Sequence, residues 1–156
     1  MITPTTYKNR YANVDLTPIK TRLSRHSITV LRVSLGLVFL GFGILKFFPG
    51  ASPAEDLAIR TVDALTLGIV SGGPALWLTA AVECFIGMTL VSGRWLRAGL
   101  ATLGFALIGI LSPLVLFFGD LFPGAPTLEA QYVLKDVVLA ASGLVIGASA
   151  LGARLR

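Results

Sequence analysis

Charged residues are scarce in this sequence. Asp, Glu, Lys and Arg together make up 13% of its 156 residues, whereas soluble domains usually carry about 25%. Hydrophobic residues make up 54%. This imbalance excludes an ordinary soluble domain and predicts an integral membrane protein. The net charge of +5 does not indicate nucleic-acid binding, because the basic residues lie at the ends of apolar segments.

Residues that build metal and redox centres are also few. The sequence has a single cysteine, Cys84, and a single histidine, His26. One cysteine excludes an intramolecular disulfide, a CxxC motif and a Cys/His metal pair. No nucleotide-binding fingerprint is present either. The sequence therefore predicts no metal site and no bound cofactor, and it favours a non-catalytic role over an enzyme.

Long apolar stretches dominate what is present. Each is about 20 residues long, the length that a helix needs to cross the hydrocarbon core of a membrane. We therefore expect an all-α fold, a bundle of four transmembrane helices, with a kink at Pro113 in the third. The four predicted spans cover residues 28–48, 74–92, 96–118 and 131–151.

The basic residues predict how these spans are oriented. They gather in a tail of residues 1–27, in the link between the second and third spans, and in residues 152–156, whereas acidic residues prevail in the other two links. By the positive-inside rule, we expect the domain of residues 28–151 to cross the cell's inner (cytoplasmic) membrane with both termini in the cytoplasm. The tail is too polar to order itself, so residues 1–25 are a candidate contact site for another subunit.

The first outer link carries the pattern of a further helix. Ser52, Pro53 and Glu55 have the spacing of a capping box, and the "SGG" of residues 71–73 would end the helix. Apolar residues from Leu57 onward form one stripe, with charged residues opposite. We expect an amphipathic helix on the outer membrane surface or over the mouth of the bundle.

Ionisable residues also fall inside the predicted spans. A charge at the bilayer centre costs roughly 3 kcal/mol on insertion scales, so such residues usually face the bundle interior and pair. We predict that Lys46 pairs with Glu83, which lies near mid-membrane, within an intramembrane charge cluster. The cluster comprises Arg32, Lys46, Glu83, Lys135 and Asp136. Snorkelling of the basic residues is the alternative. Glu83 is a structural ion-pair residue, handles a proton or ligand, or faces the helix of a partner.

Glycines share helix faces with these ionisable residues. Small residues on such a face allow two membrane helices to approach closely. We therefore predict that they mark the helix-packing surfaces. They are Gly36, Gly43, Gly87, Gly143 and Gly147.

Three segments carry a family pattern. They read "LRVSLGLVFLGFGILKFFPG", "AVECFIGMTLVSGRWLR" and "EAQYVLKDVVLAASGLVIGA". Over roughly residues 28–150, the chain resembles the DoxX family of small four-helix bacterial membrane proteins. The resemblance implies a bundle with Arg32, Lys46, Glu83 and Lys135 turned inward. It also implies a loose link to redox systems, since some relatives resemble a subunit of a thiosulfate:quinone oxidoreductase and others join complexes with oxidative-stress enzymes.

Three functions follow as expectations. The first is a non-catalytic accessory subunit of a larger membrane complex, for transport or redox chemistry, with the lipid bilayer and other membrane subunits as partners. The second is a quinone- or sulfur-linked oxidoreductase component, in which Glu83 and Lys46 bind a polar head or relay a proton. The third is a small oligomeric transporter, which the lack of a recognisable inverted repeat makes the weakest. No nucleic-acid partner is expected.

Overall fold

The computed structural model describes residues 17–153, apart from the side chains of Lys20 and Ser24. Most of the tail that the sequence offers as a contact for another subunit, residues 1–16, therefore lies outside the described part. Within that part the regular structure is all helical, as predicted. The helices are α1 (Thr17–Leu45), α2 (Glu55–Leu65), α3 (Gly72–Ser92), α4 (Leu96–Leu111), α5 (Pro113–Leu116), α6 (Phe118–Leu121) and α7 (Leu128–Ala150).

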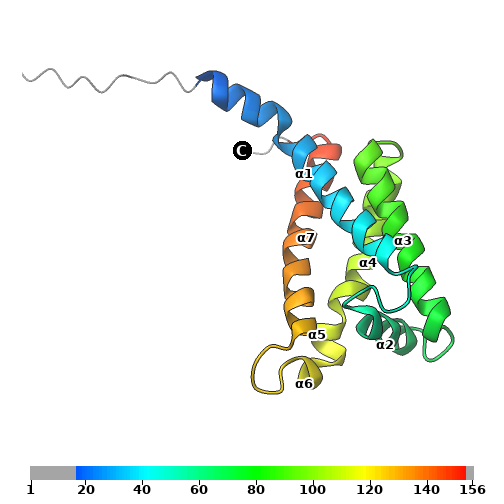
Figure 1. The fold of residues 1–156 in the computed structure, drawn as a ribbon. Helices are drawn as coiled ribbons and strands as arrows, with labels where there is room; N and C mark the ends of the chain where they lie inside the picture. The colour runs from blue at the N-terminus through cyan, green and yellow to red at the C-terminus, as the bar shows by residue number, and fades with distance from the viewer. Residues whose placement is uncertain (1–16, 154–156) are drawn as a thin grey trace, which may run out of the picture.

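The four predicted spans are present among the described residues. Four helical segments are long and apolar enough to cross a membrane, namely α1, α3, α4 with α5, and α7. The chain is therefore a multi-pass membrane protein by length and composition. The first span differs most in its bounds, because the helix already begins at Thr17, where Pro18 suits the first turn. Its 29 residues extend over roughly 43 Å, so α1 projects beyond the bundle (Figure 1).

The long helices surround a common core. The contact between α1 and α3 is the most extensive, and α7 closes the bundle by packing against both α1 and α4. Helices α2, α5 and α6 lie together at one end of the bundle, while the start of α1 and the end of α7 lie at the other (Figure 1). We call these the α2 end and the terminal end.

Pro113 interrupts the third span. The α4 helix ends at Leu111, and the short helices α5 and α6 follow it. Proline has no backbone N–H to donate to the preceding turn, which is why a kink was predicted here. Pro113 is buried, and the hydroxyl of Ser112 donates to the carbonyl of Gly109 at 2.7 Å.

The prediction of a capping box at the start of α2 is wrong. The helix begins at Glu55 with Ala54 as its N-cap, and no side chain caps it. The carboxylate of Glu55 instead accepts a hydrogen bond from the backbone N–H of Gly50 at 2.7 Å, which folds back the turn after α1. Among the described residues, the hydroxyl of Ser52 is buried without a hydrogen-bond partner.

The end of α2 also differs from the prediction. The helix stops at Leu65 rather than at residues 71–73. Leu67 and Gly68 then take left-handed conformations, with φ of 53° and 82°. The hydroxyl of Thr66 stabilises this turn, because it donates to the carbonyl of Val62 at 2.7 Å and accepts from the backbone N–H of Val70 at 3.1 Å. The link helix is therefore only 11 residues long.

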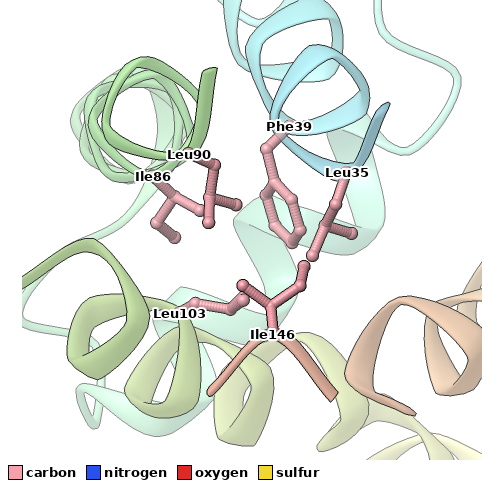
Figure 2. Packing of buried hydrophobic residues seen from close by; sticks show 6 residues of the cluster. All are labelled: Leu35, Phe39, Ile86, Leu90, Leu103 and Ile146. Atoms are coloured by element: carbon pink, nitrogen blue, oxygen red, sulfur yellow. The ribbon is translucent and has the colours of Figure 1, made fainter. Parts of the chain in front are cut away.

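Apolar side chains fill the terminal half of the bundle. Each of the four long helices contributes to this cluster, whose side chains point toward one another (Figure 2). Burial of this kind contributes about 25 cal/mol for each Å² of apolar surface removed from water. The cluster comprises Leu35, Phe39, Ile86, Leu90, Leu103 and Ile146.

Glycines account for the close contact between α1 and α3. A methyl group placed on Gly87 would lie 2.6 Å from the backbone nitrogen of Leu40, and one on Gly36 would lie 2.9 Å from the backbone nitrogen of Val91. These distances leave no room for a side chain, as the sequence predicted for this face.

The GxxxG pair in α7 behaves differently from the prediction. Gly143 packs against the side chain of Leu103, with 2.9 Å between an added methyl group and its Cδ2 atom. An added methyl group at Gly147 would meet no atom within 4 Å among the described residues. Gly143 is therefore a packing residue, as predicted, whereas Gly147 is not in close contact with another described helix.

Candidate functional site

A buried ion pair joins α1 and α3. The ammonium Nζ of Lys46 lies 2.7 Å from Oε2 of Glu83, and the two side chains are only 5% and 9% exposed. Glu83 lies in the middle of α3, and Lys46 follows the last residue of α1, where its N–H donates to the carbonyl of Gly43 at 3.2 Å. The pair predicted from the sequence is present in the structure.

Gly43 is the residue that makes this pair possible. A methyl group on Gly43 would lie 3.0 Å from Cβ of Glu83 and 2.9 Å from the backbone nitrogen of Cys84. The α1 backbone therefore passes directly against the α3 residue that carries the acid. Lys46 lies about one helical turn beyond Gly43, so its side chain can reach the carboxylate.

Burial makes this pair costly to break. Taking two charges out of water costs several kcal/mol for each ion, and the attraction between them offsets this only when the geometry is good. Removing one partner leaves an uncompensated charge, which typically costs about 3–5 kcal/mol. A buried pair contributes little net stability by itself, so its presence points to a role in specificity or in a site.

Lys135 lies near this pair but contacts aromatic rings. Its ammonium is 4.4 Å from the ring centroid of Phe42 and 4.0 Å from that of Tyr132. The two rings meet edge to face with centroids 6.4 Å apart, and the ammonium of Lys46 lies 5.8 Å from the same Phe42 ring. Phe42 thus faces two cations, an arrangement that attracts each of them through the ring quadrupole.

Asp136 is partly buried next to these groups. Among residues 17–153 it forms no hydrogen bond and no ion pair within 4 Å. Neighbouring residues on a helix point about 100° apart, so the carboxylate of Asp136 cannot follow Lys135 toward the rings. Only Lys46 and Glu83 of the predicted cluster are therefore in direct contact.

Arg32 does not belong to this cluster. Its guanidinium donates to the carbonyl of Leu90 and, at 3.5 Å, to that of Val91, at the C-terminus of α3. It thereby satisfies carbonyls that have no partner within the helix and places a cation at the negative end of the helix dipole. Lys46 lies fourteen positions after Arg32 along the chain, which corresponds to roughly 21 Å along a helix.

A cavity of about 510 Å³ occupies the α2 end of the bundle, beside the ion pair. Residues from α1, α2, α3, α4 and α7 line it. Most lining side chains are apolar, and the volume is typical of a site for a small molecule. The polar lining residues are Lys46, Thr61, Thr66, Thr79, Glu83, Tyr132, Lys135 and Asp136.

Helix α2 forms the roof of this cavity. Its buried residues Leu57 and Thr61 face the interior and line the cavity. On its exposed side, Arg60 forms an ion pair of 2.6 Å with Asp120 of α6. The guanidinium also lies 4.6 Å from the ring centroid of Phe117. Arg60 therefore connects α2 to the segment that follows Pro113.

The sequence predicted the ion pair but not the cavity. Helices α3 and α4 are joined by a short turn at the terminal end and diverge toward the α2 end, where α2 lies against both (Figure 1). The cavity arises from this divergence. Small cavity-lining residues such as Ala58, Ala106 and Gly109 were the available signal, but in an apolar sequence they do not stand out.

Comparison with known proteins adds no assignment. No protein-family model matches the chain, and neither a curated protein nor a solved structure is significantly similar to it. Among the described residues, no group of three or more His, Cys, Asp and Glu side chains could hold a metal ion. What the structure offers is a largely apolar cavity with an ion pair on its wall, where, among the described residues, only Asp136 and the Tyr132 hydroxyl of the polar lining have no hydrogen-bond or ion-pair partner and no ring beneath a cation.

Proposed function

We propose that this chain is a DoxX-like accessory subunit of a larger membrane complex, and that it holds a small amphipathic molecule in the cavity at its α2 end. One observation carries the proposal: the buried pair of Lys46 and Glu83 lies on the wall of a largely apolar cavity of about 510 Å³. Pockets that are mostly apolar, with a few convergent polar groups, are the usual form of small-molecule sites.

The proposal places the protein in a bacterial inner membrane with both termini in the cytoplasm. Arg22, Arg25, Arg94 and Arg97 all belong to the terminal end, as the positive-inside rule requires. The α2 end then faces outward. The α2 helix lies at the outer interface with its apolar side over the cavity and with Asp56 and Arg60 toward water.

The accessory role rests on what the chain supplies and what it lacks. One cysteine and one histidine give it no conventional redox centre, so any electron transfer belongs to a partner. Its outer surface is strongly apolar, with Phe105, Ile108 and Val115 each well exposed on the third span. Such a surface suits either lipid or the transmembrane helices of another subunit.

Extraction of the tagged chain from its native membrane into polymer nanodiscs, without detergent, tests this proposal. Mass spectrometry then identifies the protein subunits and small molecules that remain bound, with the untagged chain as the control. We expect a stoichiometric complex that contains one retained amphiphile for each copy of the chain. A chain that is recovered alone, with no retained small molecule, contradicts the proposal.

A second candidate is a quinone- or sulfur-linked redox component. The ammonium of Lys135 and the hydroxyl of Tyr132 are donors at the cavity wall, beside the Phe42 ring, and this set suits a flat carbonyl-bearing head. A quinone-dependent absorbance change in the purified chain would support it. The Glu83→Gln variant should then lose this signal even in the fraction of the chain that still assembles, whereas an assembled variant that keeps the signal indicates a purely structural role for Glu83.

A further inference from the structure

The cavity has a polar pole and an apolar pole on opposite sides of the bundle. Every ionisable group that lines it lies at the junction of α1, α3 and α7, where Glu83 meets Lys46 and where Lys135 covers the rings of Phe42 and Tyr132. The part of the lining contributed by α4 is apolar throughout. A molecule that fills this space must therefore be polar at one end and apolar at the other.

The apolar pole opens sideways between α3 and α4. Leu65, Leu78, Phe105 and Ile108 all line the cavity, yet they are 50%, 50%, 79% and 69% exposed. Lys135 of α7 also lines the cavity and is exposed, but the exposed apolar lining residues lie on α2, α3 and α4, and they mark a mouth toward lipid. Leu65, at the end of α2, reaches across this mouth, since its Cδ1 atom lies 3.8 Å from a methyl group placed on Gly109. In a bilayer this mouth faces hydrocarbon chains, because it belongs to two membrane-spanning segments.

The charges at the polar pole cancel. Lys46 and Lys135 supply two positive charges, and Glu83 and Asp136 supply two negative ones, so the formal sum is zero. Lys46 and Glu83 already neutralise each other. Among the described residues, Asp136 and the Tyr132 hydroxyl form no hydrogen bond, which leaves an acceptor and a donor for a bound molecule. A net charge on the bound head would remain uncompensated in this apolar setting.

We infer that the bound molecule is a single-chain amphiphile with an uncharged head that both donates and accepts hydrogen bonds, and that its chain leaves the cavity between α3 and α4. The inference rests on the proposed function and adds the ligand class, its orientation and its route. The head lies against Asp136, Tyr132 and the ion pair. The chain passes Leu78 and Phe105 into the bilayer, so the ligand enters from the lipid phase and not from water.

Photocrosslinking tests the orientation of the ligand. The probe is a monoacylglycerol with a diazirine at the chain terminus, incorporated at low mole fraction into nanodiscs that contain the wild-type chain. We expect crosslinks at Leu78, Phe105 and Ile108 that an excess of unlabelled monoacylglycerol abolishes. Competable crosslinks confined to α1 and α7, away from the mouth, would overturn the inference.

A series of matched heads tests the ligand class. Monoacylglycerol, the fatty acid and the alkyltrimethylammonium of the same chain length compete against the photoprobe. We expect the uncharged compound to compete at least 10-fold better than either ion. A fatty acid or a quaternary ammonium that competes equally well would contradict a polar pole of zero net charge.

A pair of glycine variants on α4 tests the route. Gly109→Phe places a ring in the mouth beside Leu65, whereas Gly104→Phe adds the same ring at an exposed position where nothing lies within 4 Å. We expect probe exchange to slow at least 10-fold only in Gly109→Phe. If the Gly109→Phe chain is still crosslinked in a competable manner but exchanges the probe at the wild-type rate, the ligand does not use this mouth. That result would not contradict the proposed function. If none of the three unlabelled compounds reduces crosslinking of the photoprobe to the wild-type chain, the proposed function itself is contradicted.

Discussion

Lys46 and Glu83 are the residues on which the site depends. The two side chains form a contact of 2.7 Å from different helices, and both are shielded from water and lipid. Neither residue can be ionised alone at this depth without a large penalty. Each therefore requires the other, and together they place a fixed dipole on the cavity wall.

Replacing one member of the ion pair should destabilise the protein more than replacing both members. Lys46→Met and Glu83→Gln should each lower the free energy of unfolding by about 3–5 kcal/mol, because each leaves one buried charge unpaired. The double variant should recover much of this loss, since no charge remains. Equilibrium unfolding in mixed detergent and dodecyl sulfate measures all three. A double variant that loses the sum of the two single losses would contradict a direct pairing.

This pair was also the part of the site that the sequence could predict. An acid nine residues from either end of an apolar span must be answered by a base from a neighbouring helix, and Lys46 was the base at a suitable depth. The position of Arg32 was not predictable in the same way. Its partners are backbone carbonyls at the end of α3, which no residue pattern marks.

Helix packing explains most of the architecture at the next scale. Gly36, Gly43 and Gly87 allow the backbones of α1 and α3 to touch, and this contact positions Glu83 beside Lys46. The short helix α2 then covers the space that α3 and α4 leave between them. The site thus results from the close packing of α1 against α3 and from the divergence of α3 and α4.

A methyl group at Gly87 should push helices α1 and α3 apart. Gly87→Ala places Cβ 2.6 Å from the backbone nitrogen of Leu40, and backbone atoms cannot rotate away. We expect a loss of about 1–3 kcal/mol in the free energy of unfolding, as is typical of overpacking. Gly41→Ala on α1 is the matched control, because nothing lies within 4 Å of it. Equal stabilities of the two variants would show that α1 and α3 do not touch at this level.

Arg32 should stabilise the end of α3. Arg32→Met removes hydrogen bonds to the carbonyls of Leu90 and Val91, and charged hydrogen bonds contribute about 1.5–3 kcal/mol each. We expect lower unfolding stability and faster hydrogen exchange in the last turn of α3. Arg97→Met, at an exposed position on α4, is the control and should change neither. Unchanged exchange in Arg32→Met would refute a capping role.

The link helix shows why local signals were insufficient at this scale. Residues 52–55 match a capping box, yet Glu55 binds the N–H of Gly50 and the helix starts without a side-chain cap. The spans were predicted well because hydrophobicity over 20 residues is a strong signal. Helix ends and the divergence of α3 and α4 depend on tertiary contacts, so the cavity was beyond prediction.

The whole molecule is polarised along the membrane normal. The terminal half holds the apolar cluster of Figure 2, whereas the α2 half contains the cavity, its ionisable groups and a second apolar cluster that includes Leu57 and Leu121. The proposed orientation directs this second half outward, so that the site lies in the outer leaflet.

Cysteine labelling tests that orientation. In a Cys84→Ala background, Ala125→Cys places a thiol in the exposed turn between α6 and α7, and Ala153→Cys places one after α7. We expect a membrane-impermeant maleimide to label position 125 in intact spheroplasts and position 153 only after lysis. The reverse pattern would mean that the α2 end faces the cytoplasm.

Ligand occupancy of the cavity is the most direct test of the account as a whole. Ala106 lines the cavity, so Ala106→Phe should fill it, whereas Ala101→Phe adds the same ring at an exposed position on α4 outside the cavity lining. Native mass spectrometry of chains released from nanodiscs measures the bound small molecule directly. We predict one amphiphile per chain in the wild type and in Ala101→Phe, and none in Ala106→Phe. Equal occupancy in all three chains, or none in the wild type, would contradict a ligand-binding cavity beside the Lys46–Glu83 pair.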